Sequence, residues 1–303
     1  MNRPDLDPAL LEDLARQHGT PLYVYDLRVV ERSLAAFSAF DAVRYAVKAN
    51  PNLSILATLR AGGAVCDAVS AGEVERALAA GFAPSDVVYT ADLLDRAGRE
   101  VVARHALYVN CGSASMLDDV AEIGASRDVT LRVNPGFGDG HDEKVTTGGP
   151  LSKHGIWHED LAATRERARA LGLRVTGLHV HIGSGTDTTF LRDTIGAMGD
   201  AVSLFEDDLE RVSCGGGMSF PYREDDREFD LATFSSAWRE ARDAWSERVG
   251  RHLALEAEPG RMLVAGAGLL LTEVCGTKST GDAARGGRRF VRLDAGFHTQ
   301  QRP

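Results

Sequence analysis

Short apolar runs rich in β-forming residues alternate with helical stretches along most of the chain. These runs lie at residues 43–48, 64–68, 87–89, 107–109, 129–133, 175–182, 211–214 and 253–257. Apolar residues three and four positions apart mark helices between them, at 71–80, 93–104, 115–123, 160–171, 188–205 and 231–248. Because strands and helices alternate, and the GxGxxG motif of dinucleotide-binding open sheets is missing, the pattern predicts an α/β fold, a closed (β/α)8 TIM barrel.

Segments outside this alternation predict a second, β-rich domain built from both ends of the chain. The run 22–25 (LYVY) precedes the first barrel strand, and the runs 269–274 and 290–293 follow the last one. We therefore expect a barrel domain over residues 26–262 and a β-rich domain over residues 1–25 and 263–303. The sequence stops at Pro303, soon after a strand, so this second domain is expected to be incomplete.

Charge and hydropathy narrow the range of partners. The formal net charge is -10 and the basic residues form no cluster, so nucleic acid is not expected to bind. The longest apolar run, residues 262–271, is about half of the roughly 20 residues that a membrane-spanning helix needs. Residues 1–19 have the pattern of a charged helix and lack the apolar core of a signal peptide. We expect a cytoplasmic protein with a small-molecule substrate and no membrane contact.

The cysteines give no sign of a disulfide framework or a zinc site. Cys66, Cys111, Cys214 and Cys275 lie far apart, with no CxxC pair and no histidine at metal-ligand spacing. We expect all four to be reduced thiols in the core.

Polar residues and glycines gather at the ends of the predicted barrel strands. In chain order these are Lys48, Asp67, Arg132, His179, His181, the glycines 215–217 and the EPGR segment 258–261. In a TIM barrel the carboxyl ends of all strands open on the same face, where active sites form. We therefore expect these residues to meet at one mouth of the barrel.

The glycine run and Lys48 together indicate a phosphorylated aldehyde cofactor. Glycines directly after a strand can bind an anion through backbone N–H groups, and the loops after strands seven and eight often bind phosphate in such barrels. Pyridoxal 5'-phosphate also needs an amine for its aldehyde, a flat group on its ring and a partner for its ring nitrogen. We assign Lys48 to the aldehyde, Gly216 and Gly217 with Ser184 to the phosphate, His181 to the ring face and Glu258 to the nitrogen.

A carboxylate at the ring nitrogen indicates the reaction type. It keeps that nitrogen protonated, so that the ring can accept the electron pair that remains when a bond to the α-carbon breaks. An arginine there would leave the nitrogen neutral and favour racemisation. Glu258 therefore predicts a decarboxylase.

The pair His179 and His181 leaves a metal-dependent hydrolase as an alternative. Side chains two apart on a strand share a face, and an HxH pair on a barrel strand begins many such metal sites. A complete site needs further histidines and an aspartate at later strand ends, whereas only His252 and His298 follow, neither well placed. No bound metal is therefore expected, and His179 is also a candidate core histidine.

Residues 134–156 (NPGFGDGHDEKVTTGGPLSKHGI) form a long glycine-rich segment after the fifth predicted strand. Long loops inside compact domains are usually functional or disordered. The GGPLSK stretch lacks the GxxxxGK spacing of a phosphate-binding P-loop. We interpret the segment as a lid over the barrel mouth, with a mobile surface loop as the alternative.

Several segments together carry a family resemblance. They are YAVKAN, CDAVSAGEVERALAAGF, LRVNPGFGDGH, TTGGPLSKHGI, GLHVHIGSG, CGGGMSFPY, EPGR and DAGF, and the match runs from about Pro21 to Pro303. In order and spacing they resemble the bacterial diaminopimelate decarboxylases, barrel-type pyridoxal-phosphate enzymes related to ornithine decarboxylase and alanine racemase. The resemblance implies decarboxylation of meso-2,6-diaminopimelate to L-lysine and CO2, the last step of lysine biosynthesis.

The resemblance also implies roles for individual residues. Lys48 would bond to the cofactor, His181 would stack on its ring and Glu258 would meet its nitrogen. Asp67 would lie near Lys48 and the ring, and Arg132 would belong to the same cofactor-binding set. The phosphate-binding set would be Ser184, Gly216, Gly217, Pro259, Gly260 and Arg261, and the candidates for the substrate carboxylates are Arg261 and Arg302.

Members of this family are expected to form homodimers with shared active sites. In the family, residues beyond the DAGF…RP segment complete the β-rich domain and supply a cysteine proposed as proton donor, an acidic residue and a tyrosine. None of the four cysteines here matches that position, so we expect the 303-residue chain to bind the cofactor but to turn over slowly. The SKHGI stretch favours diaminopimelate over ornithine. A decarboxylase of a related basic amino acid and a non-catalytic pyridoxal-phosphate-binding protein are the alternatives.

Overall fold

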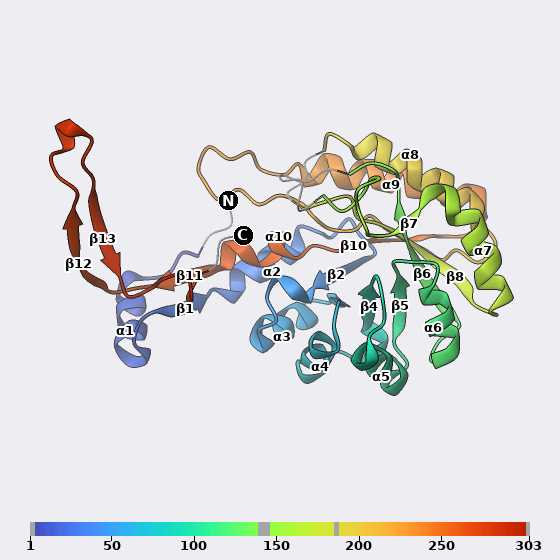
Figure 1. Cartoon of the computed structure of the whole chain (residues 1–303), viewed down its shortest axis with the longest axis horizontal. Helices are drawn as coiled ribbons and strands as arrows, with labels where there is room; N and C mark the ends of the chain where they lie inside the picture. The colour runs from blue at the N-terminus through green and yellow to red at the C-terminus, as the bar shows by residue number, and fades with distance from the viewer. Residues whose placement is uncertain (1–3, 139–145, 185–187, 301–303) are drawn as a thin grey trace. The chain divides into compact units, whose positions relative to one another are not determined.

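The chain divides into two compact units. The computed structural model describes residues 4–138, 146–184 and 188–300. Val30–Ala265 form the larger unit, and Met1–Val29 together with Gly266–Pro303 form the smaller one. Figure 1 shows the course of the chain through both units.

The larger unit contains a closed barrel of parallel strands. They are β2 (Ala42–Ala46), β3 (Val65–Ala68), β4 (Val87–Ala91), β5 (Tyr108–Cys111), β6 (Asp128–Asn134), β8 (Arg174–Val180), β9 (Arg211–Ser213) and β10 (Ala254–Ala257). Neighbours in the ring follow chain order, and the ring closes where β10 pairs with β2, with Glu256 opposite Ala42. A further short strand, β7 (Ile156–Trp157), pairs with β6. The predicted TIM barrel is confirmed.

Helices lie between the barrel strands, and two more, α2 (Leu27–Ala35) and the short α10 (Arg261–Val264), flank the series at its start and end. Those between the strands are α3 (Leu53–Ala61), α4 (Ala71–Ala79), α5 (Arg96–His105), α6 (Met116–Ile123), α7 (Leu161–Ala170), α8 (Leu191–Leu204) and α9 (Leu231–Val249). Figure 1 shows α3 to α6 following one another along the outside of β2 to β5. All the predicted barrel helices are present, with small shifts at their ends. Within the described ranges, no helix has the length and apolar character needed to cross a membrane.

Side-chain caps determine where these helices begin. The carboxylate of Asp95 accepts a hydrogen bond from Gly98 N (2.7 Å), which explains why α5 begins at Arg96 and not at the predicted residue 93. At α4, Ser70 Oγ accepts from Glu73 N (3.3 Å), and the Glu73 carboxylate accepts from a backbone N–H just before the helix (2.8 Å). Such reciprocal bonds satisfy donors that have no partner inside the helix. They also tie the helix to the end of β3, which belongs to the barrel mouth.

The barrel interior contains a buried ion pair among apolar side chains. Arg44 of β2 donates to both carboxylate oxygens of Glu256 on β10, at 2.6 and 2.7 Å. The hydroxyl of Tyr108 forms hydrogen bonds with Thr176 (2.8 Å) and Thr130 (3.0 Å). A cavity of about 10 Å³ lies among these residues and reaches the strand ends that form the mouth. The polar interior therefore continues into the candidate site.

The smaller unit consists of α1 (Pro8–His18) and two antiparallel strand pairs. β1 (Leu22–Tyr25) pairs with β11 (Gly268–Leu271), and β12 (Val274–Ser279) pairs with β13 (Arg289–Leu293). The prediction of one strand over residues 269–274 is wrong, because β11 pairs with β1 only up to Leu271, whereas Val274 begins a different strand that pairs with β13. Between the two strands, hydrogen bonds join the backbone of Glu273 to the side chain and backbone of Asp294 (2.9 and 3.2 Å).

Three of the four cysteines are buried in the barrel unit. Cys66, Cys111 and Cys214 are free and buried, which confirms the prediction of reduced core thiols for them. Burial raises the pKa of Cys66 and of Cys111 to about 12, so neither forms a thiolate near neutral pH. Cys275 is also free but lies exposed on β12, so the expected burial is wrong for it. Nearly all residues of β12 and β13 are exposed, so both faces of that hairpin are open.

Candidate active site

Lys48 lies directly after β2, in a 3-10 turn formed by Val47–Ala49. The prediction that it ends the strand itself is wrong, because β2 stops at Ala46. The turn rests on the EPGR segment: Ala46 N donates to Pro259 O (3.2 Å), and a Cβ on Gly260 would lie 3.1 Å from the Cβ of Ala46. The backbone is therefore fixed while the Lys48 side chain stays exposed and available to a ligand.

Glu258, which follows β10, has its carboxylate held from two sides. Ser213 Oγ donates to Glu258 Oε1 (2.7 Å), and Nε2 of His179 lies 2.9 Å from Oε2. Burial alone would raise the pKa of Glu258, because the side chain is only 10% exposed. The imidazole of His179 and the hydroxyl of Ser213 outweigh burial and lower that pKa to about 2. Glu258 is therefore a buried, ionised carboxylate at neutral pH.

His181 presents a neutral imidazole beside the glycine run. Its Nδ1 accepts a hydrogen bond from Gly216 N (3.1 Å), which leaves the ring proton on Nε2. Burial lowers the pKa of His181 well below its usual range, and the nearby charges of Arg132 and Lys48 act in the same direction. The rings of His179 and His181 are nearly parallel, with centroids 6.4 Å apart and planes 7° apart. The mouth therefore contains a flat, uncharged ring.

The glycines after β9 are required by close backbone packing. A Cβ on Gly216 would lie 2.2 Å from the carbonyl oxygen of Glu258. Gly217 has a φ of +90°, and a Cβ there would lie 1.9 Å from the carbonyl oxygen of Gly183. The run is thus pressed between the segments that follow β8 and β10, and any larger residue would separate them.

Asp67 and Arg132 each place at the mouth a buried polar atom that makes no hydrogen bond within the described part of the chain. Asp67 on β3 is 3% exposed, and among the described residues neither Asp67 Oδ1 nor Arg132 Nε has a hydrogen-bond partner. Burial raises the pKa of Asp67, and the nearby charge of Glu258 adds to this. Burial also lowers the pKa of Arg132. Because buried polar atoms are normally paired, these two mark positions where the polar groups of a ligand can bind.

Three residues outside the predicted set lie at the same mouth. Asp92, directly after β4, is paired with Nδ1 of His154 from the SKHGI stretch, and both side chains are largely buried. Burial opposes ionisation of Asp92, but the hydrogen bond from His154, together with the charges of His154 and Arg132, lowers its pKa. Ser213, the third, ends β9. The strand-end rule that selected Asp67 would also have selected Asp92 and Ser213, whereas no local pattern points to His154.

The described part of the predicted lid is attached to the barrel rim. Thr147 N and Oγ1 donate to the carbonyl oxygens of Ile182 and His181, each at 3.1 Å. Asn134 exchanges two hydrogen bonds with the backbone of Gly149, at 2.8 and 3.1 Å. A pocket of about 470 Å³ is lined by Phe137, Gly138, Thr146, Gly148, Pro150 and Leu151, among others. Residues 139–145 of the predicted lid lie outside the described residues.

The remaining predicted residues lie at the edge of this group or beyond the described chain. Ser184 is half-buried and directly follows Gly183, whose carbonyl packs on Gly217. Arg261 begins α10 and is half-buried. Arg302 lies outside the described residues.

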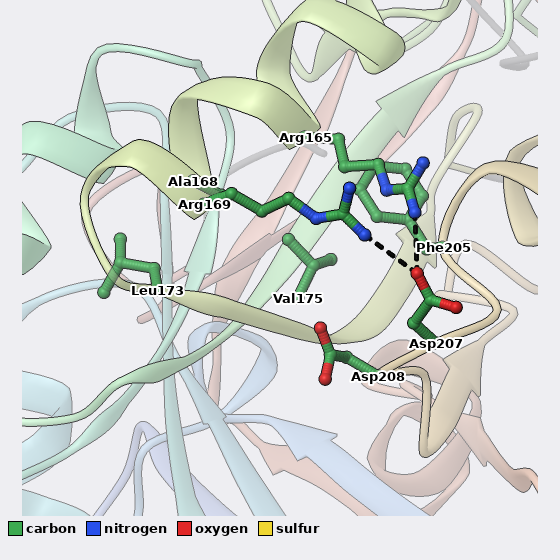
Figure 2. Close-up of a pocket in the computed structure, with 8 residues that line it drawn as sticks. All are labelled: Arg165, Ala168, Arg169, Leu173, Val175, Phe205, Asp207 and Asp208. Carbon is green, nitrogen blue, oxygen red and sulfur yellow. Dashed lines mark hydrogen bonds and ion pairs between the residues drawn. The ribbon is translucent and has the colours of Figure 1, made fainter.

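Two other features offer no competing site. Figure 2 shows another pocket, in which Arg165 and Arg169 of α7 both point to Asp207. Its volume is about 10 Å³. Each arginine lies 2.8 Å from the same carboxylate oxygen, Arg169 also pairs with Glu166 (3.5 Å), and the pocket holds little space for a ligand. Within the described ranges, no three His, Cys, Asp or Glu side chains gather in a way that could hold a metal ion. A metal site built on His179 and His181 therefore gains no support from the geometry.

Comparisons with known proteins agree on one family. The family "Pyridoxal-dependent decarboxylase, pyridoxal binding domain" matches residues 27–265. The diaminopimelate decarboxylase of Escherichia coli (strain K12) is 43% identical over 303 residues, which cover 99% of this chain and 71% of the relative. That of Streptomyces coelicolor is also 43% identical, over 98% of this chain and 68% of the relative. A crystal structure of a diaminopimelate decarboxylase superposes with a TM-score of 0.90, covering 97% of this chain and 69% of that one.

Proposed function

This chain belongs to the diaminopimelate decarboxylases, within the pyridoxal-dependent decarboxylases, and we propose that the residues at its barrel mouth catalyse loss of CO2 from meso-2,6-diaminopimelate to give L-lysine. The carbon that loses CO2 would be the D-configured one. The proposal is supported above all by the convergence of Lys48, His181 and Glu258 on one mouth, where the charges of Lys48 and Glu258 both act on the His181 imidazole.

The mouth fits pyridoxal phosphate on features of its own. Asp67 Oδ1 and Arg132 Nε are buried atoms that lack partners among the described residues, and the ring hydroxyl and phosphate of the cofactor offer suitable ones. The glycine run packs directly against the backbone of Glu258 and Gly183 with no side chain between. When bound, the cofactor accepts into its ring the electron pair that is left at the α-carbon when CO2 departs.

Lys48 and Glu258 would act at opposite ends of the cofactor ring. The exposed amine of Lys48 would tether the aldehyde until the amine of the substrate displaces it. The Glu258 carboxylate, ionised at neutral pH, would hold a proton on the ring nitrogen. Each carboxylate oxygen has two lone pairs, so the contacts with Ser213 and His179 leave capacity for this further bond.

The other residues would bind and orient. The neutral ring of His181 would lie against the cofactor ring without adding a charge that repels its protonated nitrogen. Ser184, Gly216 and Gly217 with the segment Pro259, Gly260 and Arg261 would hold the phosphate. Arg132 and Asp67 would complete the cofactor site, and Arg261 and Arg302 are proposed for the substrate carboxylates.

Trapping the lysine that bonds to the cofactor tests the assignment of Lys48. The purified chain would be incubated with pyridoxal phosphate, reduced with borohydride and digested, and the labelled peptide identified by mass spectrometry. The chain has only four lysines, Lys48, Lys144, Lys153 and Lys278, so the outcome is unambiguous. We expect label on Lys48 alone, no label in Lys48→Ala, and normal label in Lys153→Ala, whose exposed lysine lies in the SKHGI stretch. Label on another lysine would remove the central residue of the mechanism.

Release of CO2 from candidate substrates tests the specificity. We expect turnover of meso-diaminopimelate well above that of L-lysine or L-ornithine, and loss of turnover in Lys48→Ala. Faster turnover of L-ornithine than of meso-diaminopimelate would indicate a decarboxylase of a related basic amino acid. Cofactor binding with no turnover of any of the three would instead favour a non-catalytic binding protein.

We also propose that the chain acts as a homodimer in the cytoplasm. The hairpin of β12 and β13 exposes apolar side chains, with Val274, Phe290 and Val291 all more than half exposed, as at many protein interfaces. Free cysteines without a disulfide suit a reducing compartment. Light scattering coupled to size-exclusion chromatography checks the dimer, and a monomer at micromolar concentration contradicts it.

A further inference from the structure

Ser213 occupies a position between the two anchoring groups of the proposed cofactor site. It is the last residue of β9, is 3% exposed, and stands two residues before the first glycine of the run. Its hydroxyl donates to Glu258 Oε1 (2.7 Å) and accepts from Gly215 N (3.1 Å). One buried hydroxyl thus contacts both the Glu258 carboxylate, which is proposed to meet the ring nitrogen of the cofactor, and the first residue of the glycine run.

The single proton of the Ser213 hydroxyl determines the direction of its hydrogen bonds. A serine hydroxyl has one proton to donate. Because Gly215 N is itself a donor, it occupies a lone pair of Ser213, and the single proton is directed at Glu258. Glu258 Oε1 must therefore accept, which favours its ionised form. The lowered pKa of Glu258 agrees with this direction.

A second bond closes these residues into a rigid loop. Glu258 N donates to the carbonyl oxygen of Gly215 (2.8 Å), so Gly215 is held through its N–H by Ser213 and through its C=O by Glu258. The Glu258 side chain returns to Ser213. The ends of β9 and β10 are thereby joined through both backbone and side chain. The distance between the carboxylate and the glycine run is fixed before any ligand binds.

The Glu258 carboxylate would otherwise have freedom to turn. Its other oxygen, Oε2, lies 2.9 Å from His179 Nε2, which restrains one side only. The hydrogen bond from Ser213 restrains the other oxygen and so sets the orientation of the carboxylate plane.

We propose that Ser213 is a positioning residue for this reaction: its hydroxyl holds the Glu258 carboxylate toward the ring nitrogen and couples it to the glycine run that holds the phosphate. This inference rests on the proposed function, because it requires the cofactor to lie between Glu258 and the glycines. Ser213 acts through Glu258 and Gly215 and need not touch substrate.

The test measures the affinity of the cofactor-free chain for pyridoxal phosphate as a function of pH. Four proteins are compared by absorbance titration: wild type, Ser213→Ala, Glu258→Gln and the double variant. A hydrogen bond to a charged group predicts that Ser213→Ala weakens binding about tenfold at neutral pH. Its affinity should also begin to fall at higher pH than that of wild type as the solution is acidified. In the Glu258→Gln background, Ser213→Ala should have a clearly smaller effect, because only the contribution of the bond from Gly215 N to Ser213 does not depend on the charge at position 258.

Ser235→Ala serves as the matched control. It removes another buried hydroxyl, 9% exposed, from α9 of the same unit, and should leave affinity and its pH profile unchanged. Melting of each cofactor-free variant reports its folding. Should Ser213→Ala fail to fold, Ser213→Thr and Ser213→Val give the same comparison, because they match in shape and differ in the hydroxyl.

The outcomes separate this inference from the proposed function. Wild type without label on Lys48 after borohydride reduction contradicts the proposed function itself. Wild type with that label, combined with an equal loss of affinity from Ser213→Ala in both backgrounds, overturns only the role of Ser213. An unchanged affinity and pH profile in Ser213→Ala overturns it as well.

Discussion

Replacing Arg44 with methionine should lower the free energy of unfolding by about 3–5 kcal/mol, because it leaves the Glu256 carboxylate buried without a partner. The two side chains are only 10% and 8% exposed, and hydrogen bonds of 2.6 and 2.7 Å join them. The adjacent cavity of about 10 Å³ has room for roughly one water molecule. One water molecule cannot replace the two hydrogen bonds and the positive charge that the Arg44 guanidinium supplies to Glu256.

Urea unfolding followed by tryptophan fluorescence measures this loss, since Trp238 and Trp245 are buried in the same unit. The matched control is Arg96→Met on the surface of α5. Arg96 pairs with Glu100 one helical turn away, at exposures of 93% and 54%. Exposed pairs of this kind contribute about 0.5 kcal/mol or less, so the control should unfold nearly as wild type does.

The double variant Arg44→Met with Glu256→Leu isolates the cause. An apolar pair of similar volume removes the stranded charge, and most of the lost stability should return. A decrease in the free energy of unfolding of less than about 1 kcal/mol for Arg44→Met would contradict this reasoning. A double variant no more stable than the single one would also show that the unpaired Glu256 carboxylate is not the cause.

Two further substitutions probe the mouth. Gly216→Ala should abolish cofactor binding in an absorbance titration, because its Cβ would lie 2.2 Å from the Glu258 carbonyl oxygen; the control Gly196→Ala, in open space on α8, should instead stabilise the fold by about 1 kcal/mol. Asp92→Asn should melt below wild type at neutral pH. Although burial opposes ionisation, the hydrogen bond from His154 lowers the pKa of Asp92 in the folded protein. Such a carboxyl group stabilises the fold at pH values above its unfolded pKa of about 3.9. That stabilisation is lost as the pH falls through the lower pKa of the folded state. A difference in melting temperature that stays constant down to pH 3 contradicts this account of Asp92.

Most of the barrel could be predicted because its signals are local. A buried parallel strand is a short apolar run, and a covering helix repeats its apolar residues every three to four positions. Both patterns can be recognised within a window of the sequence. The ends of elements were less predictable, since caps such as Asp95 act through a single side chain. The boundary between β11 and β12 was missed because it depends on Asp294, which lies far along the chain from Glu273.

Much of the candidate site was also predictable, for a topological reason. Once the barrel is recognised, every residue at a strand end is assigned to the same mouth, and Lys48, Asp67 and Glu258 follow. That rule says which residues meet but not how they bond. The strand-end rule left open whether His179 was a core residue or a metal ligand. The structure places its Nε2 2.9 Å from the Glu258 carboxylate, a contact that the sequence did not predict.

The amino-acid sequence by itself determined the alternation of elements, the face on which the chemistry lies and the residue types available there, because periodicity and strand ends are properties of neighbouring residues. The pairings depend on the three-dimensional fold: Ser213 with Glu258 across 45 positions, His154 with Asp92 across 62, and Arg44 with Glu256 across 212. These contacts form only when the ring of strands closes. The protonation of Glu258 is set by burial and by partners far away in the chain, and so it too depends on the closed barrel.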